Sequence, residues 1–302
     1  MPGPDRQPRK SRLALVIAAA VGSLALLVSG CAPAGSAQAA AVPTLAPVPD
    51  AVALLPQSLR DSGILRIAIP TNEPPTQFFV PGTQDMTGVN PDIARLIADG
   101  LGMNVEIAVT NFDSIIPGLA ADRYDLTVSS MTPTADRLQQ LDFVDYIQMG
   151  SALVVPTGNP NSVTFEGLCG RRVAVLKGSY QLAVNVPTIN ETCSAAGRPP
   201  MEIFQFQDTT QAVGSMLSDR TDVVYADSPI LGYAAKQNPR IEVSAENDIT
   251  PVAVGMPKGD GIAPAVAAAL EHIVATPEYR TVLENYGLSS MAITDARVNV
   301  EQ

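Results

Sequence analysis

The sequence has only one histidine, His272, and three cysteines among its 302 residues. Metal sites built from several histidines or cysteines, and catalytic triads that use a histidine base, are therefore essentially excluded. His272 lies in an alanine-rich stretch that predicts a helix, and we expect it on the surface of that helix. We expect no metal and no cofactor.

Basic residues are also scarce. The chain has 19 basic and 30 acidic residues, and its first 30 residues hold four basic residues and one acidic residue. The remainder therefore carries 15 basic against 29 acidic residues. Such an acidic surface repels phosphate backbones, so nucleic acid is not an expected partner.

Residues 1–31 predict an export signal rather than part of the fold. Four basic residues precede an almost unbroken apolar run, Leu13–Val28, as in a signal peptide. The run closes in Leu27–Cys31, which resembles a bacterial lipobox, and by that resemblance Cys31 would be lipidated and would begin the mature protein. The alternative is an uncleaved membrane anchor, because the run is near the lower limit for spanning a bilayer. The lipobox reading predicts an extracytoplasmic protein anchored by lipid to the bacterial cell membrane.

Residues 32–57 are rich in alanine and proline and show no useful periodicity. We expect this segment to be a tether that holds the folded body near the membrane.

With Cys31 assigned to lipid, Cys169 and Cys193 remain. In an exported protein two such cysteines predict a disulfide. Closing a loop of about 25 residues stabilises a fold by roughly 3 kcal/mol on the chain-entropy model. Two unpaired buried thiols are the alternative.

The first half of the body alternates strands and helices. Strands are predicted at 64–69, 105–109 and 124–128, and helices at 90–100 and 113–119. We expect Asn90 and Asp113 to cap the two helices. This alternation predicts a mostly parallel sheet that binds ligands beyond the carboxyl ends of its strands.

The pattern begins again at Arg172. Strands are predicted at 173–176, 203–206 and 222–226, with helices from about residue 181, at 211–218 and from Asp227. Two αβ units argue for two lobes, and apolar strands at 152–156 and 252–256 would join them as a hinge. Helices at 263–276 and 277–286 would return the chain to the first lobe. The prediction is an α/β fold with lobe one at 58–152 plus 253–302 and lobe two at 153–252.

The segment Ser129–Arg137 predicts an anion site, because it follows the strand-like stretch Tyr124–Val128. Thr134 and Asp136 predict the start of a short helix, whose free N–H groups and positive dipole end attract an anion. Arg137 adds a planar two-pronged donor that suits a carboxylate. Taken alone, the segment also fits a capped surface helix whose arginine forms an ordinary salt bridge.

Several segments together resemble the amino-acid-binding family of ABC-transporter solute receptors, over almost all of residues 62–289. The match of each segment is weak evidence alone, but the order and spacing of all the segments make the resemblance specific. The segments that show the resemblance are Gly88–Ala94, Tyr124–Leu126, Ser130–Thr134 with Arg137, Asp142–Phe143, Arg172–Val175 with Gly178–Ser179, and Asp222–Val224 with Asp227–Pro229. The resemblance implies two αβ lobes that close around a small zwitterion and deliver it to a membrane permease.

The family's site residues carry over onto matching positions. By the resemblance, Arg137 would anchor the ligand's carboxylate with Thr132 and the backbone of Ser130 beside it, Ser179 and the Tyr180 N–H would approach from lobe two, and Asp227 would bind the ammonium group. A zwitterion that leaves water needs both charges matched, because an unpaired buried charge costs several kcal/mol. Asp227 also fits a helix cap before Pro229.

Glu73 departs from the aromatic residue that the family often has in its first loop. The prolines of Pro70–Phe79 stiffen this loop, so it can hold Glu73 and Phe78 in fixed places. A buried carboxylate there predicts a ligand with a second positive group, such as arginine, lysine, ornithine or an ectoine-like cyclic amidine. The alternative is that Glu73 points to solvent. Phe78, Phe112 and Tyr180 are the expected apolar walls.

The main expectation is therefore a lipid-anchored receptor without catalytic activity. One alternative is an enzyme of the dehydratase or lyase kind that uses a lone carboxylate, for which Glu73 has no evident partner of complementary pKa. Another alternative is a sensory receptor that signals to a partner protein.

Overall fold

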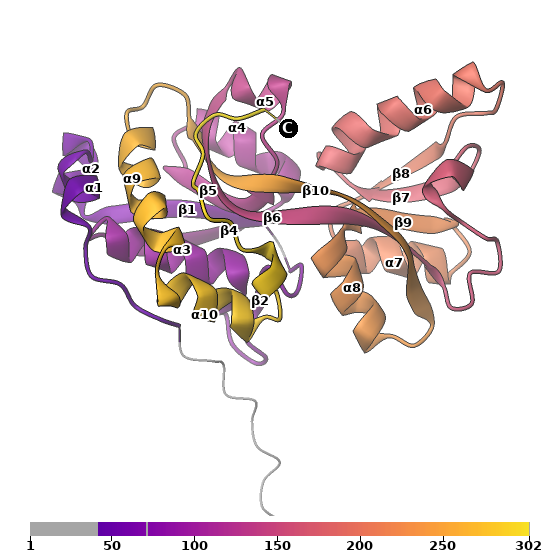
Figure 1. Ribbon diagram of the computed structural model, residues 1–302, viewed down its shortest axis with the longest axis horizontal. Coiled ribbons are helices and arrows are strands. Elements are labelled where there is room, and N and C mark those ends of the chain that lie inside the picture. The colour runs from indigo at the N-terminus through magenta and orange to yellow at the C-terminus, as the bar shows by residue number, and fades with distance from the viewer. Residues whose placement is uncertain (1–41, 71, 302) are drawn as a thin grey trace, which may run out of the picture. The chain divides into compact units, whose positions relative to one another are not determined.

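The computed structural model describes residues 42–70 and 72–301 (Figure 1). The predicted signal peptide, Cys31 and the first part of the predicted tether lie outside the described residues. Within the described part, no helix is long and apolar enough to cross a membrane.

The described strands form one mixed sheet of eight strands and one short hairpin (Figure 1). The edges of the large sheet pair parallel strands, whereas its middle strands run antiparallel. In spatial order the large sheet contains β4 (Asn104–Thr110), β1 (Ile64–Pro70), β5 (Leu126–Met131), β10 (Ile241–Pro257), β6 (Leu141–Pro156), β9 (Val223–Asp227), β7 (Arg172–Leu176) and β8 (Glu202–Phe206). The hairpin pairs β2 (Phe78–Phe79) with β3 (Met86–Thr87).

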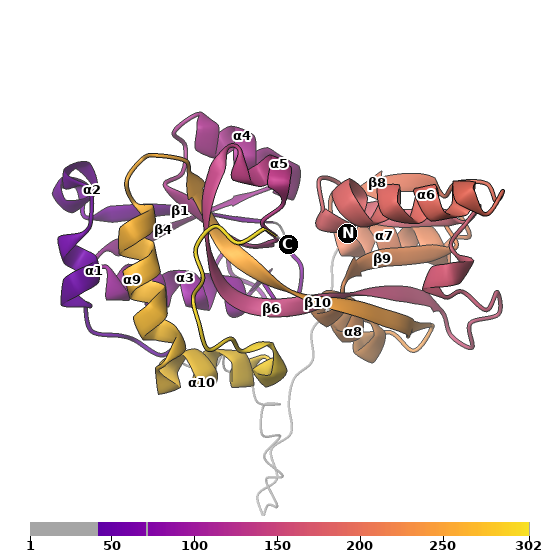
Figure 2. The same ribbon diagram turned by 45° about the horizontal axis from the view of Figure 1, so that its top comes forward.

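Two groups of helices cover the two ends of the sheet (Figure 2). Around the first three strands lie α3 (Val89–Gly100), α4 (Ile115–Ala120), α5 (Ala135–Leu138), α9 (Ala263–Val274) and α10 (Pro277–Asn285). Around the last three strands lie α6 (Val186–Ala195), α7 (Thr209–Leu217) and α8 (Ser228–Gln237). The buried apolar residues form separate clusters at the two ends. The α/β fold with two lobes, predicted from the alternating pattern, is confirmed.

The strands β6 and β10 are longer than expected and connect the two lobes. The sequence suggested separate short strands at 142–146, 152–156 and 252–256, but β6 runs through 16 residues and β10 through 17. Residues Phe143 and Ile147 of β6 belong to the cores of lobe one, and Leu153 and Val154 to those of lobe two. The pairing of β6 with β10 shifts register between Asn247 and Thr250. The predicted lobe boundaries fall within these strands and stay a prediction.

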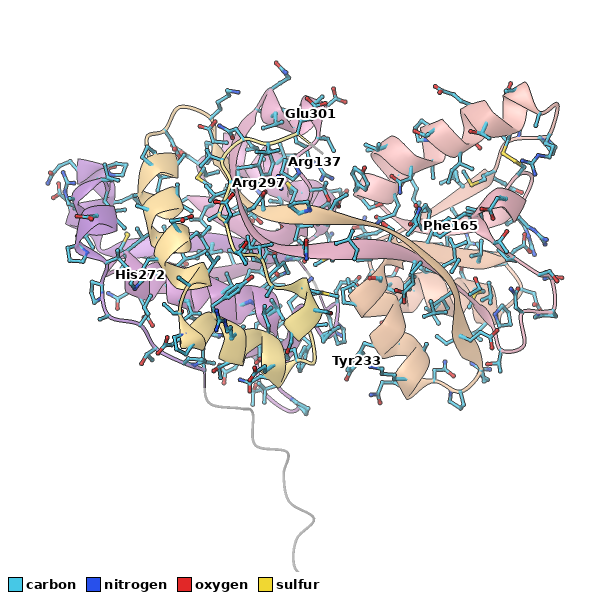
Figure 3. The ribbon with its side chains drawn as sticks, viewed as in Figure 1. Arg137, Phe165, Tyr233, His272, Arg297 and Glu301 are labelled. Atoms are coloured by element: carbon cyan, nitrogen blue, oxygen red, sulfur yellow. A yellow bond between two sulfur atoms is a disulfide. The ribbon has the colours of Figure 1, made fainter. Side chains whose placement is uncertain are left out.

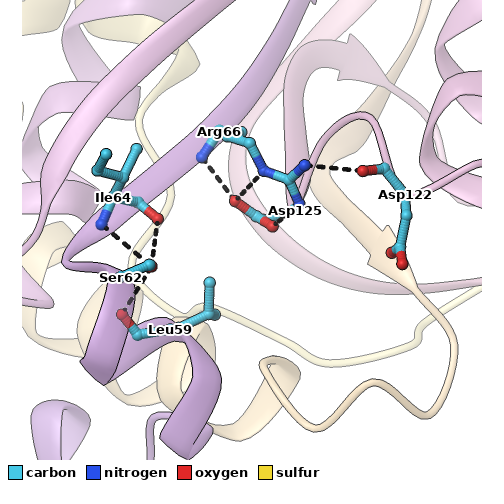
Figure 4. Close-up of polar contacts among 6 residues, drawn as sticks. All are labelled: Leu59, Ser62, Ile64, Arg66, Asp122 and Asp125. Carbon is cyan, nitrogen blue, oxygen red and sulfur yellow. Dashed lines mark hydrogen bonds and ion pairs between the residues drawn. The ribbon is translucent and has the colours of Figure 1, made fainter.

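The same arginine–aspartate pair recurs at the start of each lobe's sheet. In lobe one, Arg66 binds both carboxylate oxygens of Asp125, and its Nη1 donates to the Asp122 carbonyl at 2.7 Å (Figure 4). In lobe two, Arg172 also binds both carboxylate oxygens of Asp222, one through its backbone N–H and one through Nη2, and its Nη1 donates to the Asp219 carbonyl at 2.7 Å. Arg66 lies near the start of β1, and Arg172 is the first residue of β7. Each aspartate directly precedes the parallel neighbour of that strand, which is β5 in lobe one and β9 in lobe two.

The predicted tether is too long, because its last part is folded. The segments Pro49–Ala53 (α1) and Gln57–Ser62 (α2) are helices. The side chains of Ala51 and Leu55 are buried in the core of lobe one. Leu45 and Val48 pack against the same core. Of these four apolar residues only Ala51 lies within a helix, so no helical spacing in the sequence indicates their packing.

Asn90 does not cap its helix. The helix α3 begins at Val89, and Gly88 occupies the capping position with φ 121°. A Cβ atom at Gly88 would lie 2.6 Å from the Thr76 carbonyl oxygen, so only glycine fits. Asn90 lies inside the helix and is fully buried.

Asp113 does not cap a helix either. It lies in the 3₁₀ turn Phe112–Ser114, which has no side-chain cap, and α4 has none. Its Oδ2 instead forms an ion pair of 2.8 Å with Lys177 of lobe two.

The disulfide Cys169–Cys193 is confirmed. It joins the chain before β7 to α6 and thereby fastens two segments of lobe two. The expected surface position of His272 on α9 is also confirmed, because this residue is exposed (Figure 3).

Candidate functional site

A cavity lies at the carboxyl ends of strands from both lobes. Pro70 ends β1, Ser130 is near the end of β5, Leu176 ends β7 and Asp227 ends β9, and all four line the cavity. We call it the inner cavity. This is the position at which open α/β sheets bind ligands.

Most residues predicted for the site line the inner cavity, and several further residues join them. The predicted ones are Glu73, Phe112, Ser130, Thr132, Arg137, Ser179, Tyr180 and Asp227. The further residues are Pro70, Thr76, Gln77, Ser129, Leu176, Gln181, Thr209, Ala226 and Ile230, of which only Ser129 belongs to the predicted anion-site segment.

Arg137 is a buried guanidinium at the boundary between the lobes (Figure 3). Its Nη1 donates to the Thr132 carbonyl at 2.7 Å, and its Nη2 donates to the Gly178 carbonyl of lobe two at 2.8 Å. The guanidinium carbon lies 5.6 Å from the centre of the Phe112 ring, a cation–π distance. Burial lowers the pKa of Arg137 to about 10, and nearby Asp227 opposes this shift.

No carboxylate of the described residues lies within ion-pair distance of Arg137. Its charge is therefore solvated only by carbonyl dipoles and an aromatic face, and an anion in the cavity would be its strongest partner.

The local sequence fixes the position of this side chain. Thr134 caps α5, since its hydroxyl oxygen accepts from the Arg137 N–H at 3.3 Å. The cap predicted at Thr134 is thus present, but α5 spans only the four residues Ala135–Leu138. The turn holds Arg137 against the end of β5 rather than out in solvent.

Asp227 lies on lobe two, beside the inner cavity and at the start of α8. Asp227 occupies the N-cap position of α8, as the alternative expected, but its side chain makes no capping hydrogen bond. Its Oδ1 accepts from Gln181 Nε2 at 2.8 Å, and the same amide donates to Ser151 Oγ at 2.8 Å. Burial raises the pKa of Asp227 to about 6, while hydrogen bonding to Gln181 and the charge of Arg137 oppose the shift.

Glu73 points into the protein rather than to solvent. Its side chain is only 3% exposed, and its Oε1 accepts from the backbone N–H of Thr209 at 2.7 Å. Thr209 is the first residue of α7, so a carboxylate of lobe one meets a helix N-terminus of lobe two. Burial is the largest cause that raises the pKa of Glu73 to about 8, against the Thr209 hydrogen bonds. The alternative of a solvent-facing Glu73 is wrong.

Glu73 is held by a compact turn. Its carbonyl accepts from the Thr76 N–H at 3.0 Å and from the Thr76 hydroxyl at 2.6 Å, and its N–H donates to the Gln77 carbonyl at 2.8 Å. The turn brings Glu73, Thr76 and Gln77 together at the cavity wall.

Phe78 does not line the inner cavity. Its ring packs edge-on against Tyr286, with the ring centres 6.2 Å apart. The neighbouring Gln77 lines the cavity instead, because successive side chains in extended backbone point to opposite sides.

Ser130 cannot offer its backbone N–H to a ligand in this arrangement. That N–H donates to the Tyr146 hydroxyl at 2.9 Å, and the Ser130 hydroxyl accepts from Asn90 Nδ2 at 3.1 Å. Asn90 also donates to Gln77 Oε1 at 2.7 Å and accepts from the Tyr146 hydroxyl at 2.5 Å. This hydrogen-bond network fixes the positions of Gln77 and Ser130, which line the cavity. Ser130 thus lines the inner cavity as expected, while its own N–H and hydroxyl are engaged in this network.

Ser129 offers an unused polar atom in its place. Its side chain is 2% exposed, lines the inner cavity, and its hydroxyl has no hydrogen-bond partner among the described residues. An unpartnered buried hydroxyl is costly, so a ligand atom there would be favoured. Ser179 differs, because its hydroxyl accepts from the Leu182 N–H at 3.2 Å.

The chain is similar to several known proteins. The arginine-binding protein ArgT of Corynebacterium glutamicum is 27% identical over 255 residues, which cover 84% of each chain. The structure of an ancestral arginine-binding protein bound to arginine is 29% identical, covers 74% of this chain and 98% of its own, and has a TM-score of 0.67. A structure of an ancestral arginine-binding protein bound to glutamine is 27% identical over 75% of this chain and 98% of its own, with a TM-score of 0.68.

The family comparison covers the whole folded body apart from its ends. The match spans residues 65–289, which include both lobes and every residue that lines the inner cavity. The chain therefore belongs to the bacterial extracellular solute-binding proteins, family 3.

Proposed function

We propose that this chain is the receptor of an ABC importer and binds an amino acid with a cationic side chain between its lobes. The observation that carries the proposal is the buried carboxylate of Glu73, which lines the same cavity as Arg137 and Asp227. Two relatives support the proposal, since ArgT is an arginine-binding protein and an ancestral relative was solved with arginine bound.

The charges of the inner cavity support a cationic ligand. Arg137 would take the carboxylate of an amino acid, and Asp227 would take its ammonium group. Glu73 then supplies one further negative charge when it is ionised, and a ligand with a positive side chain would neutralise it. Arginine, lysine, ornithine and an ectoine-like cyclic amidine are the candidates. Arginine matches best, because a planar guanidinium can bind a carboxylate with two parallel hydrogen bonds.

The protonation of Glu73 defines a second candidate ligand. Its pKa of about 8 in the ligand-free protein means that the carboxyl group is mostly neutral near neutral pH. A protonated Glu73 would suit an uncharged amide, and an ancestral relative has been solved with glutamine. Glutamine is therefore the competitor against which arginine should be measured.

Closure follows from the placement of the two charges on different lobes. Arg137 belongs to lobe one and Asp227 to lobe two, so a zwitterion that binds both favours the closed arrangement over an open one. The contacts of Glu73 with Thr209 and of Arg137 with Gly178 join the lobes in the same closed arrangement.

Attachment to the membrane through a lipid on Cys31 completes the proposal. An anchored receptor stays close to its permease, which raises its effective concentration there. Mass spectrometry of the mature protein would show a lipid-modified N-terminal cysteine, and a soluble mature protein with unmodified Cys31 would contradict this part.

Calorimetric titration with arginine, glutamine, ectoine and glutamate tests the proposed ligand class. We expect arginine to bind most tightly and glutamate most weakly, because glutamate would place a third carboxylate beside Glu73 and Asp227. Glu73→Gln should weaken arginine binding by about 100-fold, the usual loss when one partner of a buried ion pair is removed. The matched exposed variant Glu191→Gln should bind like the natural protein. A preference for glutamate would end the cationic proposal.

Two further measurements, ligand recovery and uptake after deletion of the chain, separate a receptor from the two other functions. Unchanged ligand recovered from the complex supports a receptor, whereas turnover of the ligand would indicate an enzyme. A purely sensory role predicts normal binding and no loss of uptake when the chain is deleted.

A further inference from the structure

A second pocket adjoins the inner cavity on the far side of Glu73. We call it the outer pocket. Glu73, Thr209 and Ile230 line both spaces, so the two are neighbours separated by these side chains. The outer pocket adds Pro74 from lobe one and residues of α7 and α8 from lobe two.

The two spaces differ in size. The volume of the inner cavity is about 30 Å³ and that of the outer pocket is about 230 Å³. A volume of about 10–15 Å³ on this measure holds one water molecule. The closed inner cavity therefore has room for the charged groups of a ligand only if the lobes part, whereas the outer pocket already has room for a substituent.

The two spaces also differ in chemistry. Arg137, Asp227 and Glu73 all line the inner cavity. Among the described residues that line the outer pocket, Glu73 is the only carboxylate, and no lysine, arginine or histidine is present. Its walls include Val213, Ile230 and Tyr233, whose side chains are apolar or aromatic. A group that enters the outer pocket therefore gains apolar contact and meets no positive charge.

The position of Glu73 connects the two spaces to one ligand. Its Oε1 is held by the Thr209 N–H at 2.7 Å, which fixes the carboxylate on the boundary between them. Because Glu73 lines both spaces, a terminal nitrogen of a cation that lies beside its carboxylate would stand at their boundary, and a substituent on that nitrogen could extend into the outer pocket. Tyr233, on α8 and 37% exposed, offers an aromatic surface there (Figure 3).

We infer that the outer pocket accepts an uncharged alkyl or aryl group attached to the terminal nitrogen of a cationic amino acid, so that the receptor also binds N-alkylated guanidines. The inference rests on the proposed function, because it needs the cation at Glu73. It extends that function from free amino acids to their larger substituted derivatives.

The test compares L-arginine with three derivatives substituted on a terminal guanidinium nitrogen, carrying a methyl, a propyl or a carboxyethyl group. Calorimetry on the full folded body should show the methyl and propyl derivatives bound within about threefold of arginine or more tightly. The carboxyethyl derivative should bind at least about tenfold more weakly, because no positive side chain lines the outer pocket.

Thr210→Trp should fill the outer pocket, since Thr210 lines it and is exposed. We expect this variant to bind the propyl derivative at least about tenfold more weakly and arginine within about threefold of the natural protein. Thr188→Trp, at an exposed position of α6 outside both spaces, is the control and should leave both affinities unchanged.

Two results would overturn the inference while the proposed function stands. In one, the natural protein binds arginine but binds the propyl derivative about 100-fold more weakly. In the other, Thr210→Trp and Thr188→Trp affect the propyl derivative equally. If the natural protein binds neither arginine nor any derivative, the proposed function itself fails.

Discussion

At the scale of single residues, the inner cavity holds charges that the described protein does not neutralise. Arg137 donates to two carbonyl groups and faces an aromatic ring, with Asp227 nearby but outside ion-pair distance, and Asp227 has one amide donor. Glu73 has a helix N-terminus and a pKa raised to about 8. Buried charges of this kind are costly in the ligand-free protein, and a ligand of opposite charge recovers that cost.

Arg137→Ala should abolish binding of the amino acid, because the ligand's carboxylate would lose its only guanidinium partner in the cavity. We expect an affinity loss of about 100-fold or more, measured by calorimetry. The melting temperature of the ligand-free protein should change by only a few degrees, because the carbonyl groups released from Arg137 can bind water. Arg123→Ala removes an exposed arginine of the same lobe and is the control. Binding that survives in Arg137→Ala would contradict the assigned role.

Glu73→Gln should make the stability of the ligand-free protein less sensitive to pH. The folded-state pKa of Glu73 is raised from 4.5 to about 8, so the folded protein keeps a proton that the unfolded chain has lost. This contribution to stability is present below the unfolded pKa and is lost as the pH rises through the folded value. Glutamine cannot ionise, so the variant should melt a few degrees above the natural protein near pH 8 and together with it near pH 5. Identical melting curves at both values would contradict the shift.

The same group should release a proton when a cationic ligand binds. The ligand's charge favours ionised Glu73 and lowers its pKa, so binding should tighten as the pH rises from about 6 to about 8. Calorimetry in buffers with different ionisation enthalpies would measure close to one proton released per arginine in the natural protein near pH 7. Glu73→Gln should release none, and a neutral ligand such as glutamine should release none from the natural protein.

At the scale of elements, the sequence predicted most strands and helices because their apolar patterns are local. It missed features that depend on packing between distant segments. Nothing near Asn90 in the sequence reveals that Thr76 crowds the start of α3 and leaves room only for Gly88. The fused strands β6 and β10 were also missed, because polar residues at the lobe boundary resemble a loop when read alone.

In the site, too, features set by the local sequence were predictable, and features set by distant segments were not. Arg137 was singled out because it follows a predicted strand at its carboxyl end, and Asp227 because of the family resemblance. The occupied N–H of Ser130 was not identifiable, since it depends on Tyr146, which lies 16 residues away in the chain. The local sequence also does not show that the Ser129 hydroxyl has no partner among the described residues.

The repeated arginine–aspartate pair should stabilise both lobes without contributing to binding. Asp125→Asn weakens a contact made by two guanidinium nitrogens of Arg66, and Asp222→Asn weakens a contact made by the backbone N–H and one guanidinium nitrogen of Arg172. We expect each variant to lower the free energy of unfolding, measured by urea denaturation. Affinity for arginine should stay within about twofold. A large loss of affinity in either variant would show that these pairs also position the site.

Like the arginine–aspartate pairs, the disulfide should stabilise the fold without contributing to ligand binding. Replacing Cys169 and Cys193 together by serine should cost roughly 3 kcal/mol of unfolding free energy on the chain-entropy model. Urea denaturation of the oxidised protein and of the double variant measures this difference. Because the bridge joins segments of lobe two that do not line the inner cavity, ligand affinity should be unaffected.

At the scale of the whole folded body, closure depends on contacts that cross between the lobes outside the ligand. Asp113 pairs with Lys177 at 2.8 Å, and Gly178 approaches Asp113 closely with φ 76°. A Cβ atom at Gly178 would lie 3.3 Å from that of Asp113. The turn of lobe two can therefore reach lobe one only because it carries glycine.

Gly178→Ala should hinder closure and so weaken ligand binding. The positive φ disfavours alanine, and the added methyl group crowds Asp113 across the boundary. We expect about a tenfold loss of affinity and a smaller ligand-induced decrease in the radius of gyration by small-angle X-ray scattering. Gly197→Ala, whose φ is 66° but whose Cβ would meet no neighbour, separates backbone strain from crowding. Equal affinity losses in both variants would contradict the role of crowding.

The pairing of β6 with β10 gives lobe two an unusual place in the chain. Pro156 is paired with Ile241, and the Thr157 N–H donates to the Arg240 carbonyl at 2.9 Å. Residues 157–240, which make up most of lobe two, therefore leave and re-enter the two long strands at adjacent points. Such an arrangement allows the segment to be exchanged for that of a relative, or its ends to be fused to a pair of fluorescent reporters, with two neighbouring junctions and without breaking the sheet of lobe one.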